Sequence, residues 1–448
     1  MLKKCLVWHR KLSLLAGLTF LLWAGSGLVH PILSLMKIQA VAFTPPVQQI
    51  NMEGVKPPSV LVPAGMAVKR LRYLEFQGKT LLQVTTNEKP APVYIEARSG
   101  EILPNIDKER AEMLARYYAG IKDAPITLMQ IQENFDRAYA PINKLLPVWK
   151  VEFATKDQRS LYVETNTDRV GTVNTPVKLA LLWVFQRIHT LDFLQEWAST
   201  RAIFITLLIA AVFSMAMSGI GLLFLLKRPQ WPKKQRGWHR ALGVLVWLPF
   251  LMFSSSGAWH VWVKPTVITP LVDKTLNVST MVQLPQLEGN VQDLRLLPTS
   301  EGVLWRVEMG GKITYRTAEQ GTQYPLTDSQ AAVLIAAESL RLPTANFTVT
   351  GLLTRFSPEY GFANKRLPVW RLERGDNPDI VFVETRTGKV AAMVSPLHKA
   401  ELWSFTNLHK WQFLNFLGME KRDMVLMFFT LVSMLAAILG LSLKVRRK

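Results

Sequence analysis

Trp8-His9-Arg10 opens an apolar stretch that ends in Ser26-Gly27-Leu28-Val29-His30, and the same arrangement returns between Trp238-His239-Arg240 and Ser256-Gly257-Ala258-Trp259-His260. In both stretches the two histidines are 21 residues apart, which on an α-helix is about 31 Å of rise, close to the thickness of a bilayer's hydrocarbon core. At about 100° per residue the two rings also return to within about 60° of each other on the helix surface. Each stretch therefore predicts a membrane-spanning helix with an imidazole at either edge of the bilayer.

The hydropathy of the whole chain extends this prediction. Of its 448 residues, 49% are hydrophobic. Four apolar runs are each about long enough to cross a bilayer and have no charged residue in their interior. The sequence therefore predicts an integral membrane α-helical bundle that crosses the lipid bilayer with four spans. The bundle carries two large soluble insertions. The four runs are Leu12–Leu35, Ala202–Leu226, Ala241–Val263 and Met424–Leu443.

The positions of lysine and arginine predict the orientation of the spans. Basic residues cluster at both termini and in the short loop after the second span, and the positive-inside rule places such clusters in the cytoplasm. The long insertions then face the periplasm of a bacterium, with the spans in its inner (cytoplasmic) membrane. The net charge of +20 is thus partly a topology signal, and no basic face typical of a nucleic-acid-binding module is recognisable, so we expect no nucleic acid partner. The basic residues are Lys3, Lys4, Arg10, Lys11, Lys227, Arg228, Lys233, Lys234, Arg236, Arg240, Lys444, Arg446, Arg447 and Lys448.

The chain divides into segments at these spans. We expect the first span to be retained, because its apolar core is longer than that of a signal peptide and no Ala-x-Ala site follows it. The predicted segments are a first transmembrane helix (1–36), periplasmic domain 1 (37–198), a second transmembrane helix (199–227), a cytoplasmic loop (228–240), a third transmembrane helix (241–263), periplasmic domain 2 (264–422), and a fourth transmembrane helix with a cytoplasmic tail (423–448).

An internal duplication extends through the insertions as well. The offset between equivalent residues stays at 220–230, so each half consists of a span, a periplasmic domain and a second span. Because both halves enter the membrane in the same direction, we expect an approximate two-fold axis along the membrane normal. The equivalent segments are Leu146–Glu152 with Leu367–Glu373, Val163–Thr167 with Val383–Thr387, Trp183 with Trp403, and His189 with His409.

Each insertion has the pattern of a small α+β domain. Short alternating segments predict strands at Leu71–Phe76, Leu81–Thr86 and Val93–Glu96. Asp107 is the expected N-cap of a helix that runs to about Tyr118, and Asp328 is the expected cap of its counterpart. A further helix is expected at about Thr127–Ala138.

The histidines are the residues most able to bind a cofactor. Six of the seven belong to the repeat, and Cys5 is the only cysteine, which excludes a thiolate metal cluster and a Cys-x-x-Cys-His haem attachment. Imidazoles that face each other across a helical bundle suit b-type haem with two axial histidines. Copper or zinc, which need three or four converging ligands, fit less well, and a structural role beside interfacial tryptophans stays open. The candidate ligands are His9, His239, His30, His260, His189 and His409.

Neighbouring residues add two weaker signals. Arg10 and Arg240 directly follow two of the histidines and either pair with haem propionates or serve only as topology charges. Small-residue stretches at Ala24–Gly27, Ser218–Gly221 and Ser254–Gly257 would let a porphyrin or a neighbouring helix approach closely. We find no Walker loop, Gly-x-Ser-x-Gly, His-Glu-x-x-His or dinucleotide-binding motif.

The span openings Trp-His-Arg-x-Leu at 8–12 and Trp-His-Arg-Ala-Leu-Gly at 238–243 resemble those of PepSY-associated transmembrane proteins, and the hairpins at Val93–Ile102 and Val383–Val390 resemble PepSY modules. The family includes bacterial inner-membrane ferric-siderophore reductases with haem inside the bundle. The resemblance implies that His9 and His239 match the family's span-opening histidine, and that His189 and His409 match the one before the next span.

Together these features predict an inner-membrane oxidoreductase. It would pass electrons through haem b, with two or more haems per chain, to a periplasmic acceptor such as a ferric siderophore. Either membrane quinol or a separate cytoplasmic reductase would be the electron donor. Because PepSY modules also occur as binding domains, the alternative is a non-redox periplasmic sensor or protease-regulating protein.

Overall fold

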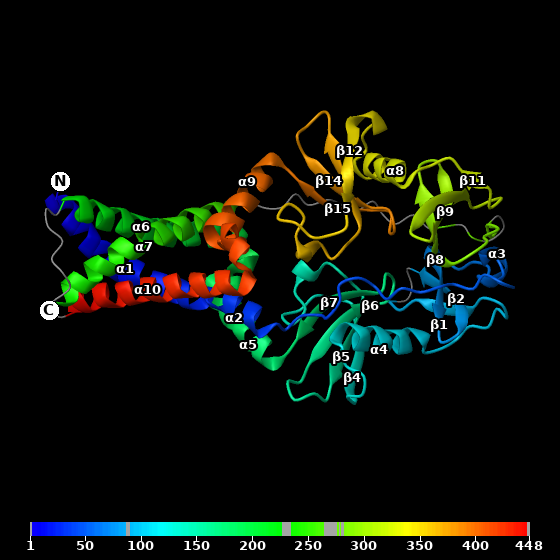
Figure 1. The fold of residues 1–448 in the computed structure, drawn as a ribbon, viewed down its shortest axis with the longest axis horizontal. Coiled ribbons are helices and arrows are strands. Elements are labelled where there is room, and N and C mark those ends of the chain that lie inside the picture. Colours follow the sequence, from blue (N-terminus) through cyan, green and yellow to red (C-terminus); the bar gives the residue numbers. More distant parts are fainter. Residues whose placement is uncertain are drawn as a thin grey trace. The chain divides into compact units, whose positions relative to one another are not determined.

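The computed structural model describes residues 2–86, 90–225, 234–263, 276, 278 and 282–445. Two compact units are present, and each contains parts of both halves of the sequence (Figure 1). The helical unit consists of Met1–Ile38, Val177–Pro265 and Pro396–Lys448, and the sheet unit consists of Gln39–Pro176 and Thr266–Ser395. Of the basic residues used to predict topology, Lys227, Arg228, Lys233, Arg446, Arg447 and Lys448 lie outside the described residues.

The helical unit confirms the four apolar helices. Within the described residues, four helical segments are long and apolar enough to cross a membrane. The first consists of two consecutive helices, and α1 and α7 each pack against both α6 and α10, so α1 and α7 lie on opposite corners of the bundle. The rings of Phe20 on α1 and Phe250 on α7 stack across the centre with 4.2 Å between their centroids. The helices are α1 (Leu2–Gly27), α2 (Val29–Met36), α6 (Ala198–Leu225), α7 (Gln235–Trp262) and α10 (Met419–Val445).

A short helical segment precedes the second span of each half. Both copies have an α-helix, a π-helical turn that ends on a histidine, and a 3₁₀ segment. A π-turn inserts one residue into the helical repeat, and such turns are frequent at functional sites. From Val177 and from Pro396 these segments pack with the helical unit, and the predicted boundaries at 198 and 422 between domain and span stay predictions. They are α5 (Pro176–Val184), η2 (Phe185–His189), η3 (Asp192–Trp197), α9 (Pro396–Ser404), η6 (Phe405–His409) and η7 (Gln412–Leu417).

One sheet joins the two halves of the sheet unit. Its order is β11-β10-β9-β8-β1-β2-β3, and antiparallel pairing of β1 with β8 connects the first half to the second. Each half also forms a four-stranded sheet, β4-β5-β6-β7 or β12-β13-β14-β15, and the helix α4 or α8 packs against strands of its own half. The central-sheet strands are β1 (Val68–Phe76), β2 (Lys79–Thr86), β3 (Val93–Glu96), β8 (Val291–Thr299), β9 (Gly302–Met309), β10 (Lys312–Thr317) and β11 (Gln323–Tyr324).

The remaining elements complete the α+β pattern. The described elements of the two halves follow one order, except that α2 and α3 occur only in the first half and β11 and η4 only in the second. They are α3 (Pro58–Leu61), α4 (Ile106–Ala119), β4 (Ile126–Gln132), η1 (Pro141–Asn143), β5 (Val148–Phe153), β6 (Ser160–Glu164), β7 (Arg169–Asn174), α8 (Asp328–Leu340), η4 (Thr344–Asn346), β12 (Phe347–Leu353), η5 (Phe362–Asn364), β13 (Val369–Arg374), β14 (Ile380–Glu384) and β15 (Lys389–Val394).

Three predictions about local structure were wrong. The expected helix at Thr127–Ala138 is instead strand β4 followed by a loop, because β4 pairs along its length with β5. Asp107 is not an N-cap: Asn105 precedes α4, and the Asp107 carboxylate accepts hydrogen bonds from the Tyr94 hydroxyl at 2.7 Å and from Trp149 at 2.5 Å.

The cap of α8 also differs from the prediction. Thr327 is the N-cap and forms a capping box with Gln330. Asp328 instead accepts hydrogen bonds from Tyr315 and Trp370, both at 2.6 Å. Asp107 and Asp328 therefore each link a helix to two strands. An Asp at the start of an apolar segment is expected to cap a helix, and the sequence alone does not show such contacts with strands. The three strands predicted from alternation are confirmed as parts of β1, β2 and β3.

Candidate functional site

Two pairs of histidines face each other inside the helical unit. In the first pair, the His9 ring on α1 and the His239 ring on α7 have centroids 6.1 Å apart. The Nδ1 of His9 lies 3.2 Å from the carbonyl oxygen of Met215 on α6, and the Nδ1 of His239 lies 2.8 Å from that of Ala436 on α10. A carbonyl can only accept, so both Nδ1 atoms are donors and Nε2 is the nitrogen left to bind a ligand.

The second pair repeats this arrangement at the other end of the bundle. The rings of His189 in η2 and His409 in η6 have centroids 6.2 Å apart. The Nδ1 of His189 lies 3.1 Å from the carbonyl oxygen of Trp23, and the Nδ1 of His409 lies 3.0 Å from the hydroxyl of Ser256. Each imidazole is thus oriented by a helix adjacent to its own, which is the support that metal-binding histidines normally have.

A glycine lies against each of the four rings. A Cβ atom on Gly440 would lie 2.8 Å from Cε1 of His239, and one on Gly219 would lie 3.2 Å from Cε1 of His9. The equivalent distances are 3.3 Å from Gly27 to His189 and 3.8 Å from Gly257 to His409. Larger residues at the first three positions would displace the rings, so the glycines hold the imidazoles close to the neighbouring helix.

The spacing within each pair fits a metal bound between two imidazoles. A metal–nitrogen bond of about 2 Å and about 1.1 Å from the nitrogen to the ring centre, counted on both sides, give about 6.2 Å between centroids. Within the part of the chain that the structure describes, no group of three or more His, Cys, Asp or Glu side chains could hold a metal ion. Two imidazoles would hold a haem iron, whereas a zinc or copper site would need three or four ligands.

The two pairs lie at opposite ends of a packed apolar core. Ser26, which lies 3.2 Å from the His189 ring, follows His9 by 17 residues on nearly continuous helix, which is about 25 Å of rise. The stacked rings of Phe20 and Phe250 occupy the region between them. Both halves supply one residue to each of these three levels.

His30 and His260 lie one ring away from the second pair, because Phe185 packs against both His30 and His189, and Phe405 packs against both His260 and His409. Both are exposed at the ends of their helices, and their rings pack on Phe185 and Phe405 with centroids 4.4 and 4.1 Å apart. The Nδ1 of His260 also lies 2.5 Å from Oε1 of the buried Glu401. The structure does not bring either of them opposite another described imidazole, so their role as ligands stays a prediction.

Arg10 is exposed and Arg240 is partly buried, each beside its histidine. Their expected contact with haem propionates stays a prediction.

Sequence reasoning missed Gly440, Glu401 and the two phenylalanines of the π-turns. The repeat itself could have found Gly440, because it lies 221 residues after Gly219.

Comparisons with known protein families and with curated proteins find no match to this chain. The likeness to PepSY-associated transmembrane proteins therefore stays a prediction from the residues quoted above, and the function has to be inferred from the chain's own geometry.

Proposed function

We propose that this chain is a multi-pass protein of the bacterial inner membrane that binds two b-type haems, one between His9 and His239 and one between His189 and His409, and passes electrons to a ferric siderophore. The main support is the pair of imidazole separations, 6.1 and 6.2 Å, with each Nδ1 held by a hydrogen bond. The four apolar helices support the location.

Haem, when bound, supplies one-electron chemistry at its iron. The chain's own residues hold and orient it. The backbone carbonyls of Met215, Ala436 and Trp23 fix the tautomer of three of the imidazoles, and hydrogen bonding to Nδ1 makes an imidazole a stronger ligand. The apolar packing around Phe20 and Phe250 excludes water between the two levels, and a low dielectric around the cofactor tunes its potential.

The acceptor is inferred from the chemistry of iron. Ferric iron is a hard, highly charged ion that siderophores hold through oxygen atoms, and its reduction to the ferrous ion weakens that grip. One haem near each end of an apolar bundle would provide a route for the electron across the membrane. The donor on the cytoplasmic side is quinol or a separate reductase.

The haem content of the purified protein tests the proposal. Cells supplied with a haem precursor should yield a red-brown protein with two haems per chain by the pyridine haemochrome assay. His9→Ala and His239→Ala should each leave one haem, because either change removes an axial ligand from the same centre. His398→Ala is the matched control and should leave both haems, since His398 lies outside the two pairs.

A second measurement tests electron transfer. Protein reduced by dithionite should be reoxidised when it is mixed anaerobically with a ferric hydroxamate siderophore, with a shift of the Soret band. A protein that stays colourless despite ample haem would contradict the proposal and favour the non-redox binding protein. Full haem content in both single variants would refute the ligand assignment.

A further inference from the structure

Arginines lie side by side on one face of the central sheet. The pairing of β1 with β8 puts Arg72 opposite Arg295, and the pairing of β8 with β9 puts Arg295 opposite Arg306. All three are buried. Like charges directly opposite each other on neighbouring strands repel, so this row needs negative charge close by.

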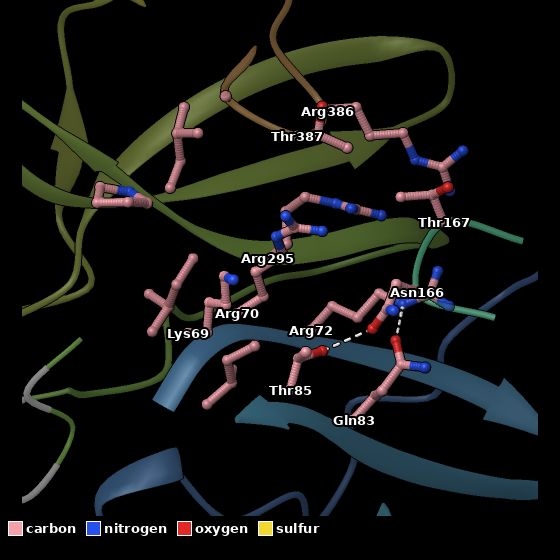
Figure 2. Close-up of a pocket in the computed structure, with 15 residues that line it drawn as sticks. Lys69, Arg70, Arg72, Gln83, Thr85, Asn166, Thr167, Arg295, Arg386 and Thr387 are labelled. Carbon is pink, nitrogen blue, oxygen red and sulfur yellow. Dashed lines mark hydrogen bonds between the residues drawn. The ribbon is translucent and has the colours of Figure 1, made fainter. Parts of the chain in front are cut away.

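A cavity of about 80 Å³ opens beside this row, several times the volume that one water molecule needs. Figure 2 shows its walls: strands β1 and β2, strand β8, and the turns that follow β6 and β14. Among the described residues that line it, five are basic and none is acidic. The five are Lys69, Arg70, Arg72, Arg295 and Arg386.

Two nearby carboxylates, Asp168 and Asp293, pair with these arginines and do not line the cavity. Asp168 accepts hydrogen bonds from Arg72 at 2.7 and 2.9 Å and also pairs with Arg110. Asp293 binds Arg295 and lies 3.5 Å from Arg386. Both aspartates are buried away from the cavity lining.

Asp293 is shared with a third arginine. Arg306 reaches it at 3.2 Å and also lies 3.3 Å from Glu308 and 3.6 Å from Asp328. The Nε of Arg386 is buried and has no hydrogen-bond partner among the described residues. Of the arginines that line the cavity, Arg386 is thus the one with a buried donor left unsatisfied among the described residues.

The two copies of the repeat differ at this place. The turn after β6 reads Thr165-Asn166-Thr167-Asp168, and the equivalent turn after β14 reads Thr385-Arg386-Thr387-Gly388. The second copy replaces an aspartate by glycine and an asparagine by arginine, so its turn is two charges more positive. Gly388 has a φ of 63° and Asp168 has one of 59°, so both positions have left-handed backbone. The two places also differ in space, because a Cβ on Gly388 would lie 2.6 Å from Leu297.

We propose that this cavity binds a small anion with two or more negative charges, carried by phosphate or carboxylate groups. Guanidinium groups bind both through paired hydrogen bonds, and Arg386 presents such a group from the second turn. The proposal does not depend on electron transfer, because the site lies wholly within the sheet unit.

The electrostatics of Arg295 agree with this assignment. Burial and the neighbouring charge of Arg386 outweigh the attraction of Asp293 and lower the pKa of the Arg295 guanidinium to about 10. An arginine normally titrates above 12. A bound anion would restore favourable surroundings for its charge.

The test is calorimetric titration of the purified full-length chain at low ionic strength, with inorganic phosphate in one arm and citrate in the other. Wild type should bind at least one of them and should gain thermal stability as the anion is added. Arg386→Asn should weaken binding at least tenfold. Asparagine is the residue that the equivalent turn of the first copy has at position 166, so this turn accommodates it.

Two further variants sharpen the result. Arg386→Lys keeps the charge but loses the paired hydrogen bonds, and should fall between wild type and Arg386→Asn. Arg374→Gln removes an arginine of similar exposure that pairs with Asp376 on another part of the unit, and should change affinity less than twofold. Binding of phosphate alone indicates a tetrahedral oxyanion, and binding of citrate alone indicates a carboxylate ligand.

Two outcomes would overturn the proposal. One is the absence of any heat or thermal shift in wild type with either anion up to about 10 mM. The other is unchanged affinity in Arg386→Asn, which would place the binding elsewhere on the chain.

Discussion

The two copies of the repeat match in the helical unit and differ in the sheet unit. In the helical unit each copy supplies one histidine to each pair and one phenylalanine to the stack between them. In the sheet unit the equivalent turns after β6 and β14 have opposite electrostatic roles, an acidic anchor at Asp168 and a basic wall at Arg386. The proposed haem centre would take one ligand from each copy, which requires the copies to match. A pocket with a single sign of charge requires them to differ.

The largest expected effect comes from removing the acidic anchor of the first copy. Asp168→Asn leaves the buried guanidinium groups of Arg72 and Arg110 without their carboxylate. Breaking a buried ion pair on one side costs about 3–5 kcal/mol, because the remaining charge stays buried. Urea unfolding of the full chain, followed by tryptophan fluorescence, measures the loss.

The matched control for this change is Asp376→Asn. Asp376 pairs with Arg374 at the surface, where ion pairs contribute little, and the unfolding midpoint should not move. Equal destabilisation by both substitutions would show that Asp168 is not the anchor of the arginine row.

The second prediction concerns pH and a carboxylate of the second copy. Burial alone would raise the pKa of Glu384, but Arg169 and Arg366 lower it well below its usual range. Its contribution to stability is therefore present above the unfolded-state pKa of about 4.3 and is lost as the pH falls towards the lower folded-state pKa.

We expect the free energy of unfolding to fall by up to about 1.4 kcal/mol per pH unit below pH 4 on account of this group. Glu384→Gln should be less stable than wild type at pH 7 and should lose less on acidification. Glu373→Gln, at an exposed site, should stay within about 0.5 kcal/mol of wild type at pH 7. A pH profile of Glu384→Gln parallel to that of wild type would contradict the assignment.

The helical part of the fold could be predicted from sequence because long apolar runs without charges have few alternatives. The runs beginning at Leu12 and Met424 lie within α1–α2 and α10, and the strands from Leu71 to Glu96 follow simple alternation. Whether Thr127–Ala138 forms a helix or a strand depends on the pairing of β4 with β5. The local sequence pattern does not reveal this pairing. The joining of both halves in one sheet through β1 and β8 is likewise a long-range contact.

The site shows the same division. The histidines of both pairs are recognisable from their repeat, whereas the partner of each ring depends on helix packing. His30 and His260 have the same sequence signal as His9 and His239, yet they pack on phenylalanines at the surface. The basic cavity was missed, because its arginines are far apart in the chain and only the strand register places Arg72 opposite Arg295.

The smallest expected effects come from three of the four glycines and test how closely the helical copies match. An alanine Cβ would lie 2.8 Å from the ring of His239 at Gly440, 3.2 Å from that of His9 at Gly219, and 3.8 Å from that of His409 at Gly257. Overpacking of this kind costs about 1–3 kcal/mol, while alanine in a helix otherwise gains up to about 1 kcal/mol over glycine.

Haem retention should therefore fall most in Gly440→Ala, less in Gly219→Ala, and not at all in Gly257→Ala, which serves as the control. The rate of haem transfer to excess apomyoglobin measures retention. Because Gly440 and Gly219 flank the same histidine pair, the two variants should weaken one centre and leave the other, so each should show a fast phase and an unchanged slow phase. Equal loss in all three variants would mean that contact with the rings does not determine the effect, and the helical copies would then match in sequence without matching in the way they hold the imidazoles.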